Sequence, residues 1–231
     1  MHSPPRPPRA RAPFLITGLV CASSSLVLLV LVAVSWSPLI SLDTAVAEAL
    51  HRRAVTEPGL VHLNRVLTDW VWDPWTMRVL TAVVVIALWW RGSRLLAGWV
   101  AATSLIATLV QQGLKAAVGR ERPRWLDPVD SAHYAAFPSG HVMTAAVTCG
   151  LLLWLLRLHG APQPLWWGSL VIGVISVAGV AFTRVYLGVH WLSDVVGGVV
   201  LGGTVVALSV AGYTGYSRRT GRPVRDEETP L

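Results

Sequence analysis

Three short clusters of cations, histidines and turn residues stand out in the second half of the chain. In chain order their members are Lys115, Arg122 and Pro123, then Pro138, Ser139, Gly140 and His141, then Arg184, His190 and Asp194. Three cations from three separate segments suit one multiply charged anion, because the arginine fork matches phosphate oxygens in a bidentate way. These residue types therefore predict a site that binds phosphate.

The histidines and the turn residues add reactive groups to this site. His190 and Asp194 are four residues apart and share one face of a helix if the last apolar segment has begun there. A carboxylate that fixes the imidazole tautomer leaves the other ring nitrogen free to attack. His141 is suited to protonate a leaving alkoxide. Ser139 and Gly140 open the next apolar segment, where the free N–H groups of a helix start bind phosphate.

Each cluster also has a structural interpretation. A Lys/Arg pair at a helix end is commonly an interfacial flank, and a Pro-Ser-Gly turn is commonly a loop with a helix cap. A His–Asp pair at this spacing is often a structural hydrogen bond. The string PSGH arises by chance about once in a thousand chains of this length. The occurrence of all three clusters, in order, favours the site.

Composition places these clusters in a membrane protein. Of the 231 residues, 53% are hydrophobic and 13% are charged, whereas soluble domains carry about a quarter charged residues. Most arginines behind the formal charge of +7 lie between or outside apolar runs, which is typical of basic membrane flanks and not of nucleic-acid binding. Cys21 and Cys149 lie inside apolar segments and imply no disulfide or metal framework.

The apolar runs must form the elements that position the clusters. They cover residues 14–36, 76–90, 95–115, 141–157, 165–183 and 191–212. Runs of this kind predict six transmembrane helices, and the first is longer than the apolar core of a signal peptide, which favours a retained anchor. Charged residues recur at helical spacing over residues 38–75, as in interfacial helices. The sequence therefore predicts an all-α polytopic membrane protein with six transmembrane helices plus an outward amphipathic helical segment.

The ends of the chain and the short connections predict its orientation. Residues 1–13 are rich in proline and arginine and are expected to form a disordered cytoplasmic tail, residues 14–212 the membrane domain, and residues 213–231 a cytoplasmic tail. The positive-inside rule places both tails and the arginine-bearing turns in the cytoplasm. The three clusters then face the outside of the plasma membrane, although the outer segments carry arginines too.

The clusters resemble the three-part signature of the phosphatidic acid phosphatase type 2 superfamily, K-x6-RP, PSGH and SR-x5-H-x3-D. Ten of the eleven signature positions match, and the six-span layout is similar over roughly residues 40–212. The exception is Thr183, which stands where the family has serine. Threonine keeps the hydroxyl group, so we expect a hydrogen bond to phosphate to survive there.

The resemblance implies a mechanism and a set of roles. His190 attacks phosphorus and forms a phosphohistidine, Asp194 orients it, and His141 protonates the departing lipid oxygen and helps to activate water. The phosphate-binding residues that the resemblance implies are Lys115, Arg122, Ser139, Gly140 and Arg184. It implies a lipid phosphatase without a cofactor, because phosphoryl transfer needs mainly positioning and charge stabilisation.

The loop between the first two clusters carries further polar residues for which the sequence predicts no catalytic role. Glu121, Asp127 and Asp130 are expected to be solvated, so that no magnesium site is predicted, and His133 is expected at the surface. The partner is a membrane lipid, not nucleic acid. The sequence predicts no oligomeric state.

Three other functions share these residues. Vanadium-dependent haloperoxidases resemble the same signature, but they are soluble. A lipid phosphotransferase would pass the phosphate to an alcohol instead of water, and only product analysis separates the two. A non-catalytic transport or lipid-binding protein would hold its charges near mid-membrane, whereas these lie at span ends. Undecaprenyl pyrophosphate, phosphatidylglycerol phosphate and phosphatidic acid all remain possible substrates.

Overall fold

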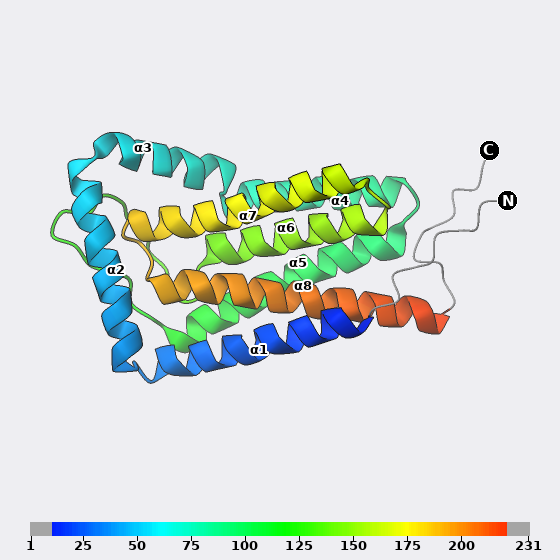
Figure 1. Cartoon of the computed structure of the whole chain (residues 1–231), viewed down its shortest axis with the longest axis horizontal. Helices are drawn as coiled ribbons and strands as arrows, with labels where there is room; N and C mark the ends of the chain where they lie inside the picture. Colours follow the sequence, from blue (N-terminus) through cyan, green and yellow to red (C-terminus); the bar gives the residue numbers. More distant parts are fainter. Residues whose placement is uncertain (1–10, 221–231) are drawn as a thin grey trace.

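The computed structural model describes residues 11–220, and every regular element in that range is a helix (Figure 1). The elements are α1 Arg11–Ala33, α2 Ser37–Thr56, α3 Pro58–Val66, the π-helical turn η1 Leu67–Val71, α4 Pro74–Trp90, α5 Arg94–Val118, α6 Gly140–Leu158, α7 Gln163–Tyr186 and α8 Leu192–Thr220. Residues 11–220 contain no strand. The predicted all-α class is confirmed.

Six helical runs are long and apolar enough to cross a membrane. They are Arg11–Ala33, Pro58–Trp90, Arg94–Val118, Gly140–Leu158, Gln163–Tyr186 and Leu192–Thr220. In Figure 1 the long helices run side by side, while α2 lies across one end of the bundle. Outward apolar side chains such as Ile106 and Ile175 stay exposed, as expected where lipid is the solvent. The prediction of six spans plus an amphipathic segment is confirmed.

Two helix ends differ from the predicted boundaries. Helix α1 begins at Arg11, within the segment predicted as a tail, and α8 runs to Thr220, well past residue 212. The long arginine side chain explains part of this difference: a Cβ on Gly215 of α8 would lie 3.2 Å from Nε of Arg11. Arginine stems pack along a helix while their charge reaches water, so both helices continue beyond the apolar run. The rest of the predicted tails, residues 1–10 and 221–231, lies outside the described residues.

The predicted amphipathic segment 38–75 forms α2, α3 and η1, and a helix cap then starts α4. The Asp73 carboxylate accepts hydrogen bonds from the backbone N–H groups of Trp75 at 2.6 Å and Thr76 at 3.3 Å. Pro74 at the first helical position needs no partner for its nitrogen. The chain therefore turns from η1 into α4 at Asp73.

Glycines bring α8 close to the loop that precedes α6. A Cβ on Gly198 would lie 2.9 Å from the carbonyl oxygen of Ser139, and one on Gly197 would lie 2.5 Å from Cε2 of Phe137. Such close backbone approach needs a residue without a side chain. The Ser139 N–H also donates to the Asp194 carbonyl at 3.0 Å. The second and third clusters are thus held side by side.

Candidate active site

The three clusters meet at one end of the bundle, at the end crossed by α2 in Figure 1. A cavity of about 300 Å³ lies there. Six predicted site residues line it: Lys115, Arg122, Gly140, His141, Arg184 and His190. The other two, Ser139 and Asp194, are completely buried behind it. The structure therefore brings all eight together.

Two helix ends shape the loops around this cavity. Helix α5 stops at Gly119, whose φ of 58° is the left-handed conformation that glycine adopts without strain. The chain then turns back so that Arg122 reaches His190. After α7, a Cβ on Gly188 would lie 2.5 Å from Nε1 of Trp125, which donates to the Gly188 carbonyl at 2.9 Å. The loop after α5 thus packs directly on the loop that carries His190.

The hydrogen bonds of His190 fix its tautomer. Nη1 of Arg122 lies 3.1 Å from Nε2 of His190, and Nδ1 of His190 lies 3.3 Å from Oδ2 of Asp194. A guanidinium only donates, so Nε2 must be the acceptor and the ring proton must sit on Nδ1, facing the carboxylate. The lone pair of Nε2 is therefore available beside the cations of the cavity.

The same surroundings keep the imidazole neutral. Burial lowers the pKa of His190 well below its ordinary value of 6.5, and the charges of Arg122, Arg184 and Lys115 lower it further. Burial and the neighbouring Arg184 also lower the pKa of Arg122, to about 10, so this guanidinium stays charged near neutral pH. A neutral histidine beside fixed cations is the arrangement that a nucleophile attacking a phosphate dianion needs.

Backbone carbonyls of the neighbouring loops hold two of the cations. Nε of Arg122 donates to the Tyr134 carbonyl at 2.5 Å, and its Nη1 donates to the Val189 carbonyl. Nζ of Lys115 donates to the Ala135 carbonyl. Neutral carbonyls orient these side chains without cancelling their charge, so the cavity keeps a strong preference for anions.

Two buried polar groups of the predicted site lack a partner among the residues that the structure describes. Arg184 is 5% exposed, and its Nη1 lies 3.4 Å from Oγ1 of Thr68, but its Nε has no hydrogen-bond partner within residues 11–220. Oγ of Ser139, fully buried, likewise has none in the described part of the chain. Buried donors without an acceptor cost free energy, so these two groups are suited to binding a ligand that supplies acceptors. Phosphate oxygens would satisfy both.

The Thr183 hydroxyl has a different use from the one expected. Its Oγ1 donates to the Val180 carbonyl of its own helix at 2.9 Å, and the residue is 1% exposed. The hydroxyl is thus engaged with α7 instead of being held towards the cavity. A threonine in a helix readily bonds the preceding turn in this way, and the expected hydrogen bond from Thr183 to phosphate stays a prediction.

Sequence reasoning missed a charged network behind His190. Nη1 of Arg120 donates to Oδ1 of Asp194 at 2.6 Å, and Nη2 donates to Oδ2 of Asp43 at 2.7 Å. Asp43, on α2, also accepts from the Ser193 N–H at 2.8 Å and from its hydroxyl at 2.5 Å. Asp43 is 1% exposed although it lies in the amphipathic segment. The network fixes the carboxylate of Asp194 and ties α2 to the site.

This network makes Asp43 a positioning residue with a measurable effect. We expect Asp43→Asn to lower kcat by about 10²-fold, because small misplacement of reacting groups costs about that much. KM for the lipid should change little, because Asp43 lies behind Asp194, away from the phosphate cations. The matched control is Glu48→Gln on the same helix, whose carboxylate is exposed and lies 3.9 Å from Arg52. Equal kcat in both variants would contradict a positioning role.

The remaining charged groups of the loop lie towards solvent. Glu121 is exposed and lies 3.2 Å from Arg124, and Asp127 and His133 are exposed as predicted, while Asp130 is half-buried. No group of three His, Cys, Asp or Glu side chains within residues 11–220 is placed to hold a metal ion. Metal independence remains a prediction to be tested by activity.

Comparison with known proteins agrees with this geometry. The family model of the PAP2 superfamily matches residues 96–217. A decaprenylphosphoryl-5-phosphoribose phosphatase of Mycobacterium tuberculosis is 32% identical over 183 residues, 77% of this chain and 95% of the relative. An undecaprenyl-diphosphatase of Sulfolobus acidocaldarius is 28% identical over 158 residues, 65% of this chain and 68% of the relative.

A relative and a crystal structure from Bacillus subtilis extend the comparison. Phosphatidylglycerophosphatase B is 36% identical over 96 residues, 41% of this chain and 46% of the relative. The crystal structure of a transmembrane PAP2 type phosphatidylglycerolphosphate phosphatase superposes with a TM-score of 0.74, covering 88% of this chain and 96% of that one. Its sequence identity of 22% means that this likeness bears on the fold alone.

Proposed function

The chain belongs to the PAP2 superfamily, and from this premise we propose that it is an integral membrane lipid phosphatase that acts through a phosphohistidine at His190. The observation that carries the proposal is the state of His190. Its Nε2 lone pair lies 3.1 Å from a guanidinium nitrogen of Arg122, inside a cavity lined by cations, while Asp194 holds the opposite nitrogen.

The first step forms one bond and breaks one. Nε2 of His190 attacks phosphorus, and the bond from phosphorus to the lipid oxygen breaks with its electron pair on that oxygen. His141 donates a proton to the leaving oxygen, so this oxygen does not depart as an alkoxide. Lys115, Arg122 and Arg184 stabilise the charge on the three phosphoryl oxygens.

The second step restores the enzyme. His141, now neutral, takes a proton from water as the water oxygen attacks phosphorus. The bond between phosphorus and Nε2 breaks, inorganic phosphate leaves, and His190 returns to its neutral form on the Asp194 carboxylate. Both steps use only side chains that line or support the cavity, so we expect turnover without a metal ion.

The substrate class follows from the position of the cavity and from the relatives. The cavity lies at the end of an apolar bundle, at the level expected for lipid headgroups. The named relatives act on an undecaprenyl diphosphate, a decaprenylphosphoryl phosphoribose and a phosphatidylglycerophosphate. Chemically, each of these lipids has a second phosphate between its terminal phosphate and its chain. We propose a lipid of this class as substrate.

The distribution of basic residues supports an outward-facing site. Arg94, at the start of α5, and Arg157, in the last turn of α6, lie at the bundle end opposite the cavity, as do Arg218 and Arg219 of α8. Helix α1 begins and α8 ends there as well (Figure 1). The positive-inside rule places this end in the cytoplasm, and hence both termini there and the site on the outer face.

Phosphate release from defined lipids tests the function. The purified full-length protein in mixed micelles with EDTA should release inorganic phosphate from undecaprenyl diphosphate, phosphatidylglycerophosphate or phosphatidic acid. Absence of release from all three lipids, with and without added divalent cations, would contradict a lipid phosphatase. Phosphate appearing on an added alcohol instead of in solution would identify a phosphotransferase with the same intermediate.

The low pKa of His190 predicts the acidic limb of the pH profile. Attack requires neutral His190, so kcat/KM should hold its plateau below pH 6.5 and fall only as the pH drops through the lowered pKa. Because the Arg122 charge helps to lower this pKa, Arg122→Gln should move the limb to higher pH, besides lowering the plateau. The exposed Arg124→Gln is the control. An unmoved limb in Arg122→Gln would contradict this electrostatic role.

A further inference from the structure

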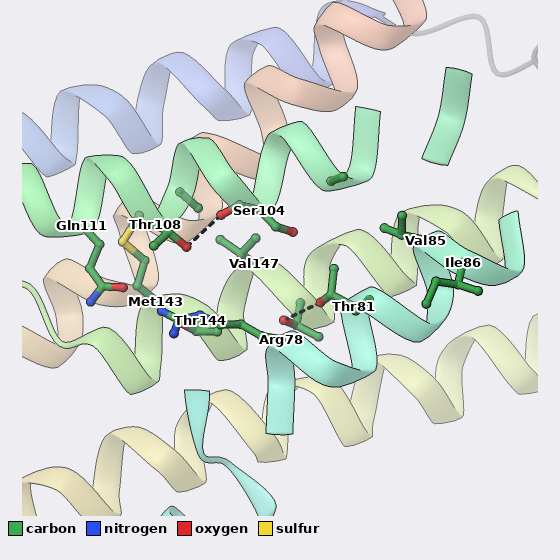
Figure 2. Close-up of a pocket in the computed structure, with 14 residues that line it drawn as sticks. Arg78, Thr81, Val85, Ile86, Ser104, Thr108, Gln111, Met143, Thr144 and Val147 are labelled. Carbon is green, nitrogen blue, oxygen red and sulfur yellow. Dashed lines mark hydrogen bonds between the residues drawn. The ribbon is translucent and has the colours of Figure 1, made fainter. Parts of the chain in front are cut away.

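A second cavity lies between α4, α5 and α6, deeper in the bundle than the cation-lined one. Its volume is about 280 Å³, and its lining is mostly apolar, with Val85, Met143 and Val147 among its residues (Figure 2). Ile86, which also lines it, is 46% exposed, so the cavity opens on the lipid-facing surface. An apolar space of this kind suits the first part of a lipid chain.

Two polar side chains line both cavities. Arg78, in the second turn of α4, and Gln111 of α5 belong to the apolar cavity and to the cation-lined cavity alike. Figure 2 shows both at the same end of the apolar cavity, away from Val85 and Ile86. A lipid with its terminal phosphate beside His190 and its chain in the apolar cavity would run past these two side chains, because both line the two cavities.

The charge of Arg78 has no carboxylate partner in the part of the chain that the structure describes. The structure places its guanidinium 5.4 Å from the ring centre of Trp75, and no carboxylate within residues 11–220 forms an ion pair with it. The Asp73 carboxylate in the same cavity instead caps α4. A half-buried cation at the end of a span is costly and is usually retained for a partner.

Gln111 supplies a second, independent observation. It is 5% exposed, and its side-chain amide makes no hydrogen bond to any described residue. Its Nε2 lies so close to the start of α6 that a Cβ on Gly140 would come within 2.6 Å of it. Because Gln111 lines both cavities, this amide is available to a ligand atom that completes its hydrogen bonds.

We propose that Arg78 and Gln111 form a second anion subsite, which binds an additional phosphate between the scissile phosphate and the lipid chain. This subsite rests on the proposed phosphatase function and narrows its substrate class. Polyprenyl diphosphates and phosphatidylglycerophosphate carry such a group, whereas phosphatidic acid carries only the scissile phosphate. Arg78 therefore selects lipids that carry an additional phosphate, which is not the phosphate transferred in the reaction.

Relative kcat/KM values test the subsite. Wild type, Arg78→Gln and the control Arg94→Gln are compared on undecaprenyl diphosphate, phosphatidylglycerophosphate and phosphatidic acid in the same micelles. Arg94 is a matched control because it lies 5.6 Å from the Trp89 ring centre in the same kind of contact, at the opposite end of the bundle. Arg78→Gln should lower kcat/KM for at least one two-phosphate lipid at least 10-fold more than for phosphatidic acid, because a lost charged hydrogen bond costs about that factor. Arg94→Gln should leave the ratios unchanged.

The outcomes separate the subsite from the function. Equal losses on all three lipids would show that Arg78 only flanks the membrane interface with Trp75, and would overturn the subsite while leaving the phosphatase intact. A wild type inactive on all three lipids would overturn the phosphatase itself. Gln111→Leu removes the amide at similar volume and should reduce the same ratio. An unchanged ratio in this folded variant would remove Gln111 from the subsite.

Discussion

Replacing His190 by alanine should lower kcat by about 10⁴-fold or more, because the covalent route through this side chain is lost altogether. His190 is 1% exposed, and its Nε2 lies beside Arg122 in the cavity. No other histidine in the described chain combines a carboxylate on one ring nitrogen with a guanidinium on the other. The rate is measured as phosphate release at saturating lipid in EDTA.

The control for this variant is His133→Ala. His133 lies in the loop between the first two clusters and is exposed. We expect wild-type turnover from His133→Ala, and the same elution in size-exclusion chromatography for both variants. A folded His190→Ala protein that keeps more than about a hundredth of the wild-type kcat would contradict a nucleophilic role.

Replacing His141 by alanine should have the second largest effect, and the size of the effect should depend on the leaving group. His141 opens α6 and lines the cavity with His190. For phosphatidic acid the leaving group is an alkoxide that needs a proton, so kcat should fall by about 10²- to 10⁴-fold. For a diphosphate the leaving group is a phosphate, whose second pKa is about 6, so the loss should be much smaller.

This dependence separates a proton donor from a residue that only binds phosphate. The loss caused by Arg184→Gln should be similar for the two lipids, because we expect Arg184 to bind the transferred group and not the leaving oxygen. A loss in His141→Ala that is equal for phosphatidic acid and undecaprenyl diphosphate would contradict the proton-donor assignment and leave His141 as a phosphate ligand.

Much of the fold could be predicted because apolar runs in a membrane leave few alternatives. Backbone groups in lipid must bond within their own segment, so runs such as 95–115 and 191–212 can only become helices. The ends of the helices could be predicted less accurately than their existence. Helix α8 continues to Thr220 since arginine stems extend the packed surface beyond the apolar run.

The cavity residues could be predicted from their types and spacing, but the residues that support them could not. The partners Arg120 and Asp43 are 77 positions apart, and nothing in the local pattern distinguishes a buried Asp43 from the exposed Glu48 on the same helix. The role proposed for Arg78 could not be predicted either, because arginines are also common at the interfacial ends of membrane spans. The need for glycine at Gly197 and Gly198 became clear only from the close approach of α8 to the loop before α6.

The most direct test of a phosphohistidine mechanism is to trap the intermediate. Wild type and His190→Ala are mixed with lipid carrying a labelled terminal phosphate, quenched with alkali within one turnover, and separated from lipid. We expect label on the wild-type protein that survives alkali, is lost in acid, and maps to His190, and none on His190→Ala. Rapid phosphate release without any labelled protein, or label that persists in His190→Ala, would contradict the mechanism.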